Sequence, residues 1–210
     1  MQDEIEGRVL SGALQPGERV NENALASELG VSRGPIREAC GRLVESGLLA
    51  VIVNRGFFVR KVSRKEAIDV YDVRASLMRL AGETLADRIS RNQLRILRDL
   101  VERMDAAEDV DDFDEFYALN REFHDRIIDY TENDRLRALC EGLVKELHLY
   151  RRRSLLQGGG LRVSNREHEN ILAALEAGDA TRAGAALEDH IRAGKQRFLA
   201  ATMQETQNTE

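Results

Sequence analysis

Two arginines stand four residues apart at the start of a helical pattern, in the run VSRGPIREAC at residues 31–40. Residues at this spacing share one face of an α-helix, so Arg33 and Arg37 can project together. The first turn of a helix also presents free backbone N–H groups and a positive dipole end, which attract phosphate. A guanidinium matches the O6 and N7 acceptors of guanine. The pattern therefore favours contact with DNA, and Gly34 leaves room for the approach.

Histidines form a second group, and all of them lie in the second half of the chain. His124, His168 and His190 fall on three separate helical patterns, and Asn120 precedes the first of them by one helical turn. Imidazole nitrogens suit zinc, nickel and similar ions, and helical bundles build metal sites from facing helices. Histidines that cap helices or bond within a core remain the competing interpretation. His148 has no partner at helical spacing and fits that second interpretation, although it can line the same cavity.

Short elements must position the two arginines. Helical patterns cover MQDEIEGRVLSGAL, NENALASELG and a stretch that Ser32 can cap, with QPGER as a turn. The run LLAVIVNRGFFVRKV is rich in β-branched and aromatic residues, so we predict a hairpin. Its tip is small and positive, with Asn54, Arg55 and Gly56. Helix, turn, helix and hairpin in this order indicate a winged helix-turn-helix, whose second helix enters the major groove of DNA.

The pattern after Ser63 is helical throughout, with no β pattern beyond residue 62. We therefore predict a mainly α fold, in which a C-terminal all-α bundle of about six helices follows the winged helix-turn-helix. The expected domains are 1–63 and 64–203, with a disordered tail at 204–210. The six helices are expected at 63–90, 91–107, 112–130, 133–155, 162–177 and 179–202.

The net charge of −6 conceals an uneven distribution. Residues 31–65 carry eight basic and two acidic groups, so this segment is strongly positive although the whole chain is acidic. Binding follows the field of a face, so nucleic acid stays a possible partner. The chain contains no signal peptide pattern and no run of about 18 apolar residues. Two distant cysteines, Cys40 and Cys140, fit a reducing compartment, so we expect a cytoplasmic protein and no membrane partner.

The run PGERVNENALASELGVSRGPIREACGRLVESGLL, followed by NRGFFV, closely resembles the DNA-binding domain of GntR-family bacterial transcription regulators. PGER, LA-x-x-LGVSR-x-P-x-RE, RL-x-x-x-GLL and RG-x-x-V stand at the family's spacing over residues 4–62. The residues that this resemblance implies as DNA contacts are Asn23, Ser32, Arg33, Arg37, Arg55 and Gly56.

The segments VRASLMRLA, NREFHDRI and REHENILAALEAGDATRAGAALEDHI resemble the FCD effector-binding domain of the FadR-type branch, over residues 66–200. Many relatives hold a metal with three histidines and an aspartate. Here the three histidines match, and Asn120 stands at the aspartate position. An amide oxygen is neutral and a weaker ligand, which leaves the fourth position to water or effector. The resemblance implies a divalent metal, zinc or nickel, and an anionic effector near Arg74, which an inter-helix salt bridge would explain equally well.

These observations predict a dimeric, ligand-responsive transcription regulator, in the repressor class, that binds a near-palindromic DNA operator and a small organic acid. One alternative is a metal-sensing regulator, in which the ion itself is the signal; neutral Asn120 argues against it. The other is a metalloenzyme with a catalytic zinc. The chain has no HExxH motif, and the candidate bases Glu122 and Glu167 are merely sequence neighbours of the histidines. We therefore expect no enzymatic activity.

Overall fold

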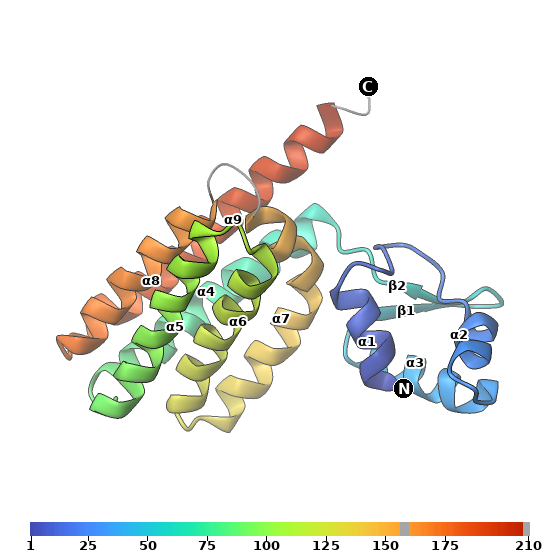
Figure 1. The fold of residues 1–210 in the computed structure, drawn as a ribbon, viewed down its shortest axis with the longest axis horizontal. Coiled ribbons are helices and arrows are strands. Elements are labelled where there is room, and N and C mark those ends of the chain that lie inside the picture. Colours follow the sequence, from blue (N-terminus) through green and yellow to red (C-terminus); the bar gives the residue numbers. More distant parts are fainter. Residues whose placement is uncertain (156–159, 208–210) are drawn as a thin grey trace. The chain divides into compact units, whose positions relative to one another are not determined.

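The computed structural model describes residues 1–155 and 160–207, apart from the side chains of residues 145, 146, 148–154 and 202–207. The chain divides into two compact units, Met1–Ser63 with Glu141–Leu149, and Arg64–Cys140 with Tyr150–Glu210. Figure 1 shows the elements of both units. Within the described ranges, no helix has the length and apolar character that crossing a bilayer requires.

The first unit contains the predicted winged helix-turn-helix. Its elements are α1 (Gln2–Leu10), α2 (Glu22–Glu28), α3 (Arg33–Glu45), β1 (Leu49–Ile52) and β2 (Gly56–Val59). The side-chain oxygen of Asn21 accepts a hydrogen bond of 3.1 Å from the Ala24 N–H and caps α2. Gly30 and Gly47, with φ values of 65° and 78°, turn the chain after α2 and α3, where other residues would be strained.

One core joins the helices of this unit to its hairpin. The strands pair antiparallel, with Leu49 opposite Val59 and Ile52 opposite Gly56. Alternation then turns Leu49, Phe57 and Val59 inward, where they join the buried faces of the helices. The residues of this core that are fully enclosed are Ile5, Val9, Ile36, Cys40 and Leu43. This packing holds α3 with its opposite face directed at solvent.

The segment expected as a simple turn, QPGER, has a further role. Arg19 forms an antiparallel bridge with Phe58 of β2. The Val20 N–H donates to the Phe57 carbonyl at 2.9 Å, and the Val59 N–H donates to the Glu18 carbonyl at 2.8 Å. The segment thus pairs with the free edge of β2 through a single β-bridge and its flanking hydrogen bonds. QPGER contains no β-branched residue, and Val20 follows it alone, so the sequence held no strand signal here.

Six helices follow Ser63 among the described residues and form the predicted bundle; the second unit contains them apart from residues 141–149 of α7. They are α4 (Arg64–Ala86), α5 (Arg91–Asp109), α6 (Phe113–Tyr130), α7 (Asp134–Leu155), α8 (Gly160–Glu176) and α9 (Ala180–Gln207). Local capping sets two of the starts: Ser90 and Gln93 form a capping box at α5, and the Asp112 side chain accepts from the Glu115 N–H at α6. Helix α9 continues to Gln207, so it includes part of the tail expected to be disordered at 204–210; residues 208–210 lie outside the described residues.

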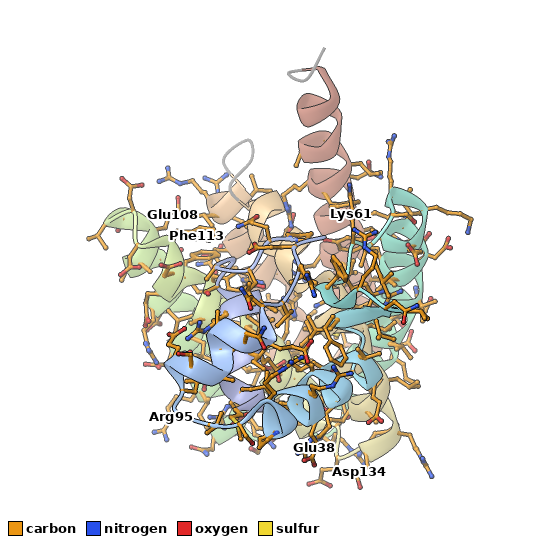
Figure 2. The ribbon with its side chains drawn as sticks, turned by 90° about the vertical axis from the view of Figure 1, so that its right-hand side faces the viewer. Glu38, Lys61, Arg95, Glu108, Phe113 and Asp134 are labelled. Carbon is orange, nitrogen blue, oxygen red and sulfur yellow. The ribbon has the colours of Figure 1, made fainter. Side chains whose placement is uncertain are left out.

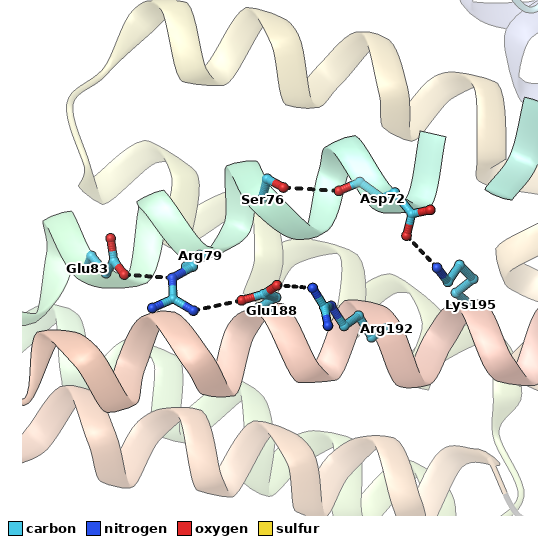
Figure 3. A network of polar contacts seen from close by, with 7 residues as sticks. All are labelled: Asp72, Ser76, Arg79, Glu83, Glu188, Arg192 and Lys195. Atoms are coloured by element: carbon cyan, nitrogen blue, oxygen red, sulfur yellow. Dashed lines mark hydrogen bonds and ion pairs between the residues drawn. The ribbon is translucent and has the colours of Figure 1, made fainter. Parts of the chain in front are cut away.

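Helices α4 and α9 cross closely because glycines stand at their contact. A Cβ on Gly82 would lie 2.6 Å from the Ala183 carbonyl oxygen, and a Cβ on Gly184 would lie 2.6 Å from the Glu83 Cγ. Ion pairs extend this contact between α4 and α9, the seam, along both helices (Figure 3). Arg79 bridges Glu83 at 2.8 Å and Glu188 at 2.9 Å. The same network includes the ion pairs Asp72–Lys195 and Glu188–Arg192. This seam sets the position of α9, which carries His190.

Candidate nucleic-acid interface and candidate metal centre

The leading end of α3 is open to solvent. Ser32, Arg33 and Gly34 are exposed, and the Arg37 side chain is 58% exposed. Ser32 occupies the N-cap position of α3, but its hydroxyl makes no capping hydrogen bond, contrary to the capping role expected from the sequence. The backbone N–H groups of the first turn are therefore not satisfied by this hydroxyl. The result is a set of outward-facing donors around two guanidinium groups.

Arg37 is held from two sides by residues that the sequence did not indicate. Its Nη1 lies 3.4 Å from Oε1 of Glu22, a buried residue of α2. Its guanidinium carbon lies 5.8 Å from the centre of the Phe57 ring on β2, within the range of a cation–π contact. Glu22 reads in the sequence as an ordinary acidic residue in a first helical turn, so nothing local distinguishes it.

The wing tip has the compact shape expected of it. The Arg55 N–H donates to the Ile52 carbonyl at 2.9 Å and closes the turn. Asn54 and Gly56 adopt positive φ values of 61° and 96°, a conformation that Asn and Gly accept more readily than other residues. The exposed Arg55 guanidinium lies 5.5 Å from the centre of the Phe58 ring. Asn23 is also exposed, in the first turn of α2.

The three histidines predicted as metal ligands converge inside the bundle. They come from α6, α8 and α9, all three are buried, and one nitrogen of each lies within 4.8 Å of the others. Nε2 of His124 lies 3.0 Å from Nε2 of His190. Two nitrogens bound to one ion at about 2.0–2.1 Å would lie roughly 2.9–3.4 Å apart, depending on the bond angle. This spacing therefore fits a shared ion, and the donor set is one that zinc and nickel accept.

Polar neighbours orient two of the rings. Nδ1 of His190 lies 2.7 Å from Oε2 of Glu167, and Nδ1 of His168 lies 3.1 Å from Oδ1 of Asn165. Arg197 donates to both oxygens of Glu167, at 2.9 and 3.0 Å. Each contact uses Nδ1, so Nε2 is the nitrogen that remains for an ion. Asn165 could have been found from its helical spacing to His168, but the sequence gave no signal for Arg197.

The electrostatics of this group favour a neutral His190. Burial lowers the pKa of His190, although hydrogen bonding to Glu167 acts in the opposite direction. Burial also opposes the ionisation of Glu167, but hydrogen bonds from His190 and Arg197 outweigh it and leave the Glu167 pKa below its ordinary value. Neutral imidazole beside an ionised carboxylate is the protonation state that metal binding requires.

A small cavity lies beside His190. Its volume is about 20 Å³, room for about one water molecule. Asn120 is 2% exposed, and its Oδ1 has no hydrogen-bond partner, which suits a donor facing an ion or a water. Arg74, also buried, lines the same cavity. The lining includes Tyr71, Arg74, Asn120, Ser164, His190 and Arg197.

The remaining candidates from the sequence are His148, Glu122 and Glu167. The His148 side chain, expected as a possible cavity residue, lies outside the described residues. Glu122, considered as a catalytic base, pairs with Arg126 at 3.0 Å, with both side chains more than two-fifths exposed. Glu167, the other such candidate, supports His190 and is itself held by Arg197. Its observed contacts are those of a residue that orients a ligand.

Comparison with known proteins agrees with both halves of this description. Residues 1–59 match the profile described as "Bacterial regulatory proteins, gntR family", and residues 69–193 match the profile of the FCD domain. The HTH-type transcriptional regulator YdhC of Bacillus subtilis is 33% identical over 150 residues, which cover 71% of this chain and 67% of that protein. The HTH-type transcriptional repressor GlaR of Escherichia coli is 27% identical over 200 residues, which cover 89% of each.

Solved structures include a similar fold of nearly the same extent. The structure of Escherichia coli McbR/YncC superposes with a TM-score of 0.82 at 25% sequence identity, and the match covers 97% of this chain and 96% of the other. The likeness therefore includes the winged unit and the bundle together.

Proposed function

The chain belongs to the GntR family of bacterial transcriptional regulators and carries an FCD domain, and from this premise we propose that it is a ligand-responsive repressor. Like these relatives, it is a transcriptional regulator and not an enzyme. In this proposal residues 1–63 bind DNA, and residues 64–203 bind the effector and form a homodimer. The protein acts in the cytoplasm, on a near-palindromic operator whose two half-sites meet the two winged domains.

DNA reading is assigned to the leading end of α3 and to the wing. The observation that carries this assignment is the solvent-exposed pair Arg33 and Arg37 on a helix whose opposite face is buried. Arginines at this position can reach guanine edges in the major groove, while the first-turn N–H groups meet phosphate. The remaining proposed contacts are Asn23, Ser32, Gly34, Asn54, Arg55 and Gly56.

Metal binding is assigned to His124, His168 and His190, with Asn120 as a weak fourth ligand. The support is the 3.0 Å spacing of two Nε2 atoms and the neutral state of His190. A bound zinc or nickel ion would supply a Lewis-acidic position for a carboxylate. Arg74 would pair with the same anion, which makes a small organic acid the natural effector.

An effector that binds at Arg74 and Asn120 must enlarge the small cavity that these two residues line. A cavity of about 20 Å³ holds a water but not an organic acid. The acid would therefore favour an arrangement of Arg74, Asn120 and their neighbours that differs from the present one. A preference of this kind is what a ligand needs to shift a conformational equilibrium, and through it DNA affinity.

The test begins with an operator. Duplexes are selected from a random-sequence pool by the full-length protein and then footprinted; two protected half-sites related by a dyad are expected. Organic acids are next screened by thermal shift, with and without zinc or nickel. An acid that raises the melting temperature only with metal, and that weakens binding to the selected duplex, supports the proposal. Failure to select any duplex would overturn the assignment of DNA reading.

The small cavity also favours a second candidate, a metal-sensing regulator in which the ion alone is the signal. In that case, titrating zinc or nickel into chelator-treated protein would change its affinity for the selected duplex without any acid. If metal alone has no effect and metal with acid does, the organic-acid proposal holds.

A further inference from the structure

Glu22 is a buried carboxylate within a domain that must approach a polyanion. It is 8% exposed and stands at the first position of α2, next to exposed Asn23. Asn21 already caps this helix, so α2 does not need the Glu22 side chain for capping. An exposed acid would serve the helix dipole equally well. Its burial therefore calls for another explanation.

The carboxylate lies between the recognition helix and the wing. Its Oε1 makes no hydrogen bond, and its nearest cationic partner is Nη1 of Arg37, at 3.4 Å. Its Oε2 lies on the wing side. A Cβ placed on Gly56 would lie 3.4 Å from this oxygen and 3.7 Å from Nη2 of Arg19. Burial raises the pKa of the Cys40 thiol to about 11, and the nearby charge of Glu22 adds to this shift. Helix α3, strand β2 and the segment around Arg19 thus lie around the negative charge of Glu22.

This arrangement restricts a side chain that would otherwise be free. Arg37 is 58% exposed, and an exposed arginine samples many rotamers. Glu22 on one side and the Phe57 ring on the other leave the guanidinium few orientations. The negative charge also offsets part of the attraction of Arg37 for phosphate, which carries no sequence information.

We infer that Glu22 is a positioning residue for DNA recognition, which holds Arg37 in the orientation that reads a base edge and weakens its use as a general phosphate contact. Glu22 therefore raises the discrimination between operator and other DNA while lowering affinity for DNA in general. This inference rests on the proposed function, because it requires Arg37 to contact a base.

The experiment compares two variants with the same charge change in the full-length protein. Glu22→Gln removes the buried charge, and Glu38→Gln removes the charge of a side chain on α3 that is 71% exposed and pairs with Arg42 (Figure 2). Fluorescence anisotropy measures the dissociation constants for the duplex selected by the wild-type protein and for a scrambled duplex. The readout is the specificity ratio, the dissociation constant for the scrambled duplex divided by that for the selected duplex.

For Glu22→Gln we expect unchanged or tighter binding to the scrambled duplex and weaker binding to the selected one, so that the ratio falls about tenfold. For Glu38→Gln we expect both duplexes to be affected alike, with the ratio unchanged. Glu22→Asp keeps the charge but shortens the reach to Arg37, so its ratio should fall without tighter binding to the scrambled duplex. If circular dichroism shows that Glu22→Gln does not fold, Glu22→Asp alone tests the inference.

Arg37→Ala separates this inference from the proposed function. If Arg37→Ala leaves the ratio unchanged, Arg37 reads no base and the proposed contact is wrong. If Arg37→Ala lowers the ratio while both Glu22 variants keep it, the contact stands and the positioning role is wrong. If substitutions at both residues lower the ratio, the double variant Glu22→Gln/Arg37→Ala should lower it no further than Arg37→Ala alone.

Discussion

At the scale of a single residue, Arg37 has two roles, as a proposed DNA contact and as the ion-pair partner of Glu22. Its exposed guanidinium is available to DNA, and the same group is the nearest cation to a buried carboxylate, that of Glu22. Truncating Arg37 therefore removes a DNA contact and also leaves a buried charge without its ion pair. Arg33 has no such second duty in the described contacts, since it is exposed at the start of α3. Binding data on these two arginines must be interpreted together with stability.

We predict that Arg37→Ala lowers the free energy of unfolding by about 1–2 kcal/mol, because a buried charged group loses its partner. Arg33→Ala should change it by no more than about 0.5 kcal/mol. Urea denaturation measures both, and gel-shift titration should show weaker binding to the selected duplex for each. Adding Glu22→Gln to Arg37→Ala should restore stability, whereas equal stability of the two single variants would contradict the role of the ion pair.

Asn120 offers a second test at the same scale. Asn120→Asp would place an anionic ligand where a neutral one now stands, so we predict zinc affinity at least about tenfold higher. Competition with a chromogenic chelator measures this affinity. The matched control, Asn92→Asp, makes the same charge change at an exposed position of α5 and should leave zinc affinity unchanged. Zinc binding by a His168→Ala variant as tight as that of the wild type would argue against the centre altogether.

At the scale of elements, the crossing of α4 and α9 positions the histidine centre. Glycines let the two backbones approach, and the ion pairs around Arg79 and Glu188 hold their alignment. His190 lies on α9 and meets histidines from α6 and α8. A shift of α9 along α4 would therefore separate His190 from its partners before it disturbed either helix.

We predict that Gly82→Ala destabilises the bundle by about 1–3 kcal/mol, because its Cβ would overlap the Ala183 backbone, which is unable to yield as a side chain would. Gly142→Ala is the matched control, since a Cβ there meets nothing within 4 Å. Alanine at that helical position should stabilise by about 0.5–1 kcal/mol. Thermal unfolding of both variants tests the pair; a Gly82→Ala variant as stable as the wild type would mean that the crossing tolerates a methyl group.

At the scale of the whole molecule, the distribution of charge matters more than its sum. The chain carries a net charge of −6, yet residues 31–65, which include the proposed DNA-reading helix and wing, are strongly basic. An acidic remainder repels DNA in other orientations and leaves the basic face as the favoured approach. Affinity should then depend on counterion release from that face.

We predict that affinity for the selected duplex falls about a hundredfold or more between 50 and 200 mM salt, as expected when several phosphates are neutralised. Anisotropy titrations over this range measure the slope. The scrambled duplex should show a comparable slope, because phosphate contacts are independent of sequence. An affinity that does not change with salt would contradict binding through the basic segment.

Local patterns were sufficient for much of the fold. Gly30, the apolar spacing of Ile36 and Leu43, and the turn NRG each act on their neighbours along the chain, so helices and hairpin could be predicted from them. The β-bridge at Arg19 could not be predicted, because its hydrogen bonds depend on β2, which lies far along the sequence. The hydroxyl of Ser32 was expected to cap α3 and does not, because capping depends on a rotamer as well as on residue type.

The order of amino acids was enough to identify the family, the winged helix-turn-helix, the helical bundle and the three histidines as a candidate group. Packing alone determined that these histidines meet, that Glu167 and Arg197 support one of them, and that Glu22 lies beneath Arg37. The reason is physical: helix periodicity arises from hydrogen bonds between near neighbours, whereas convergence and burial arise from contacts between residues that the sequence keeps far apart.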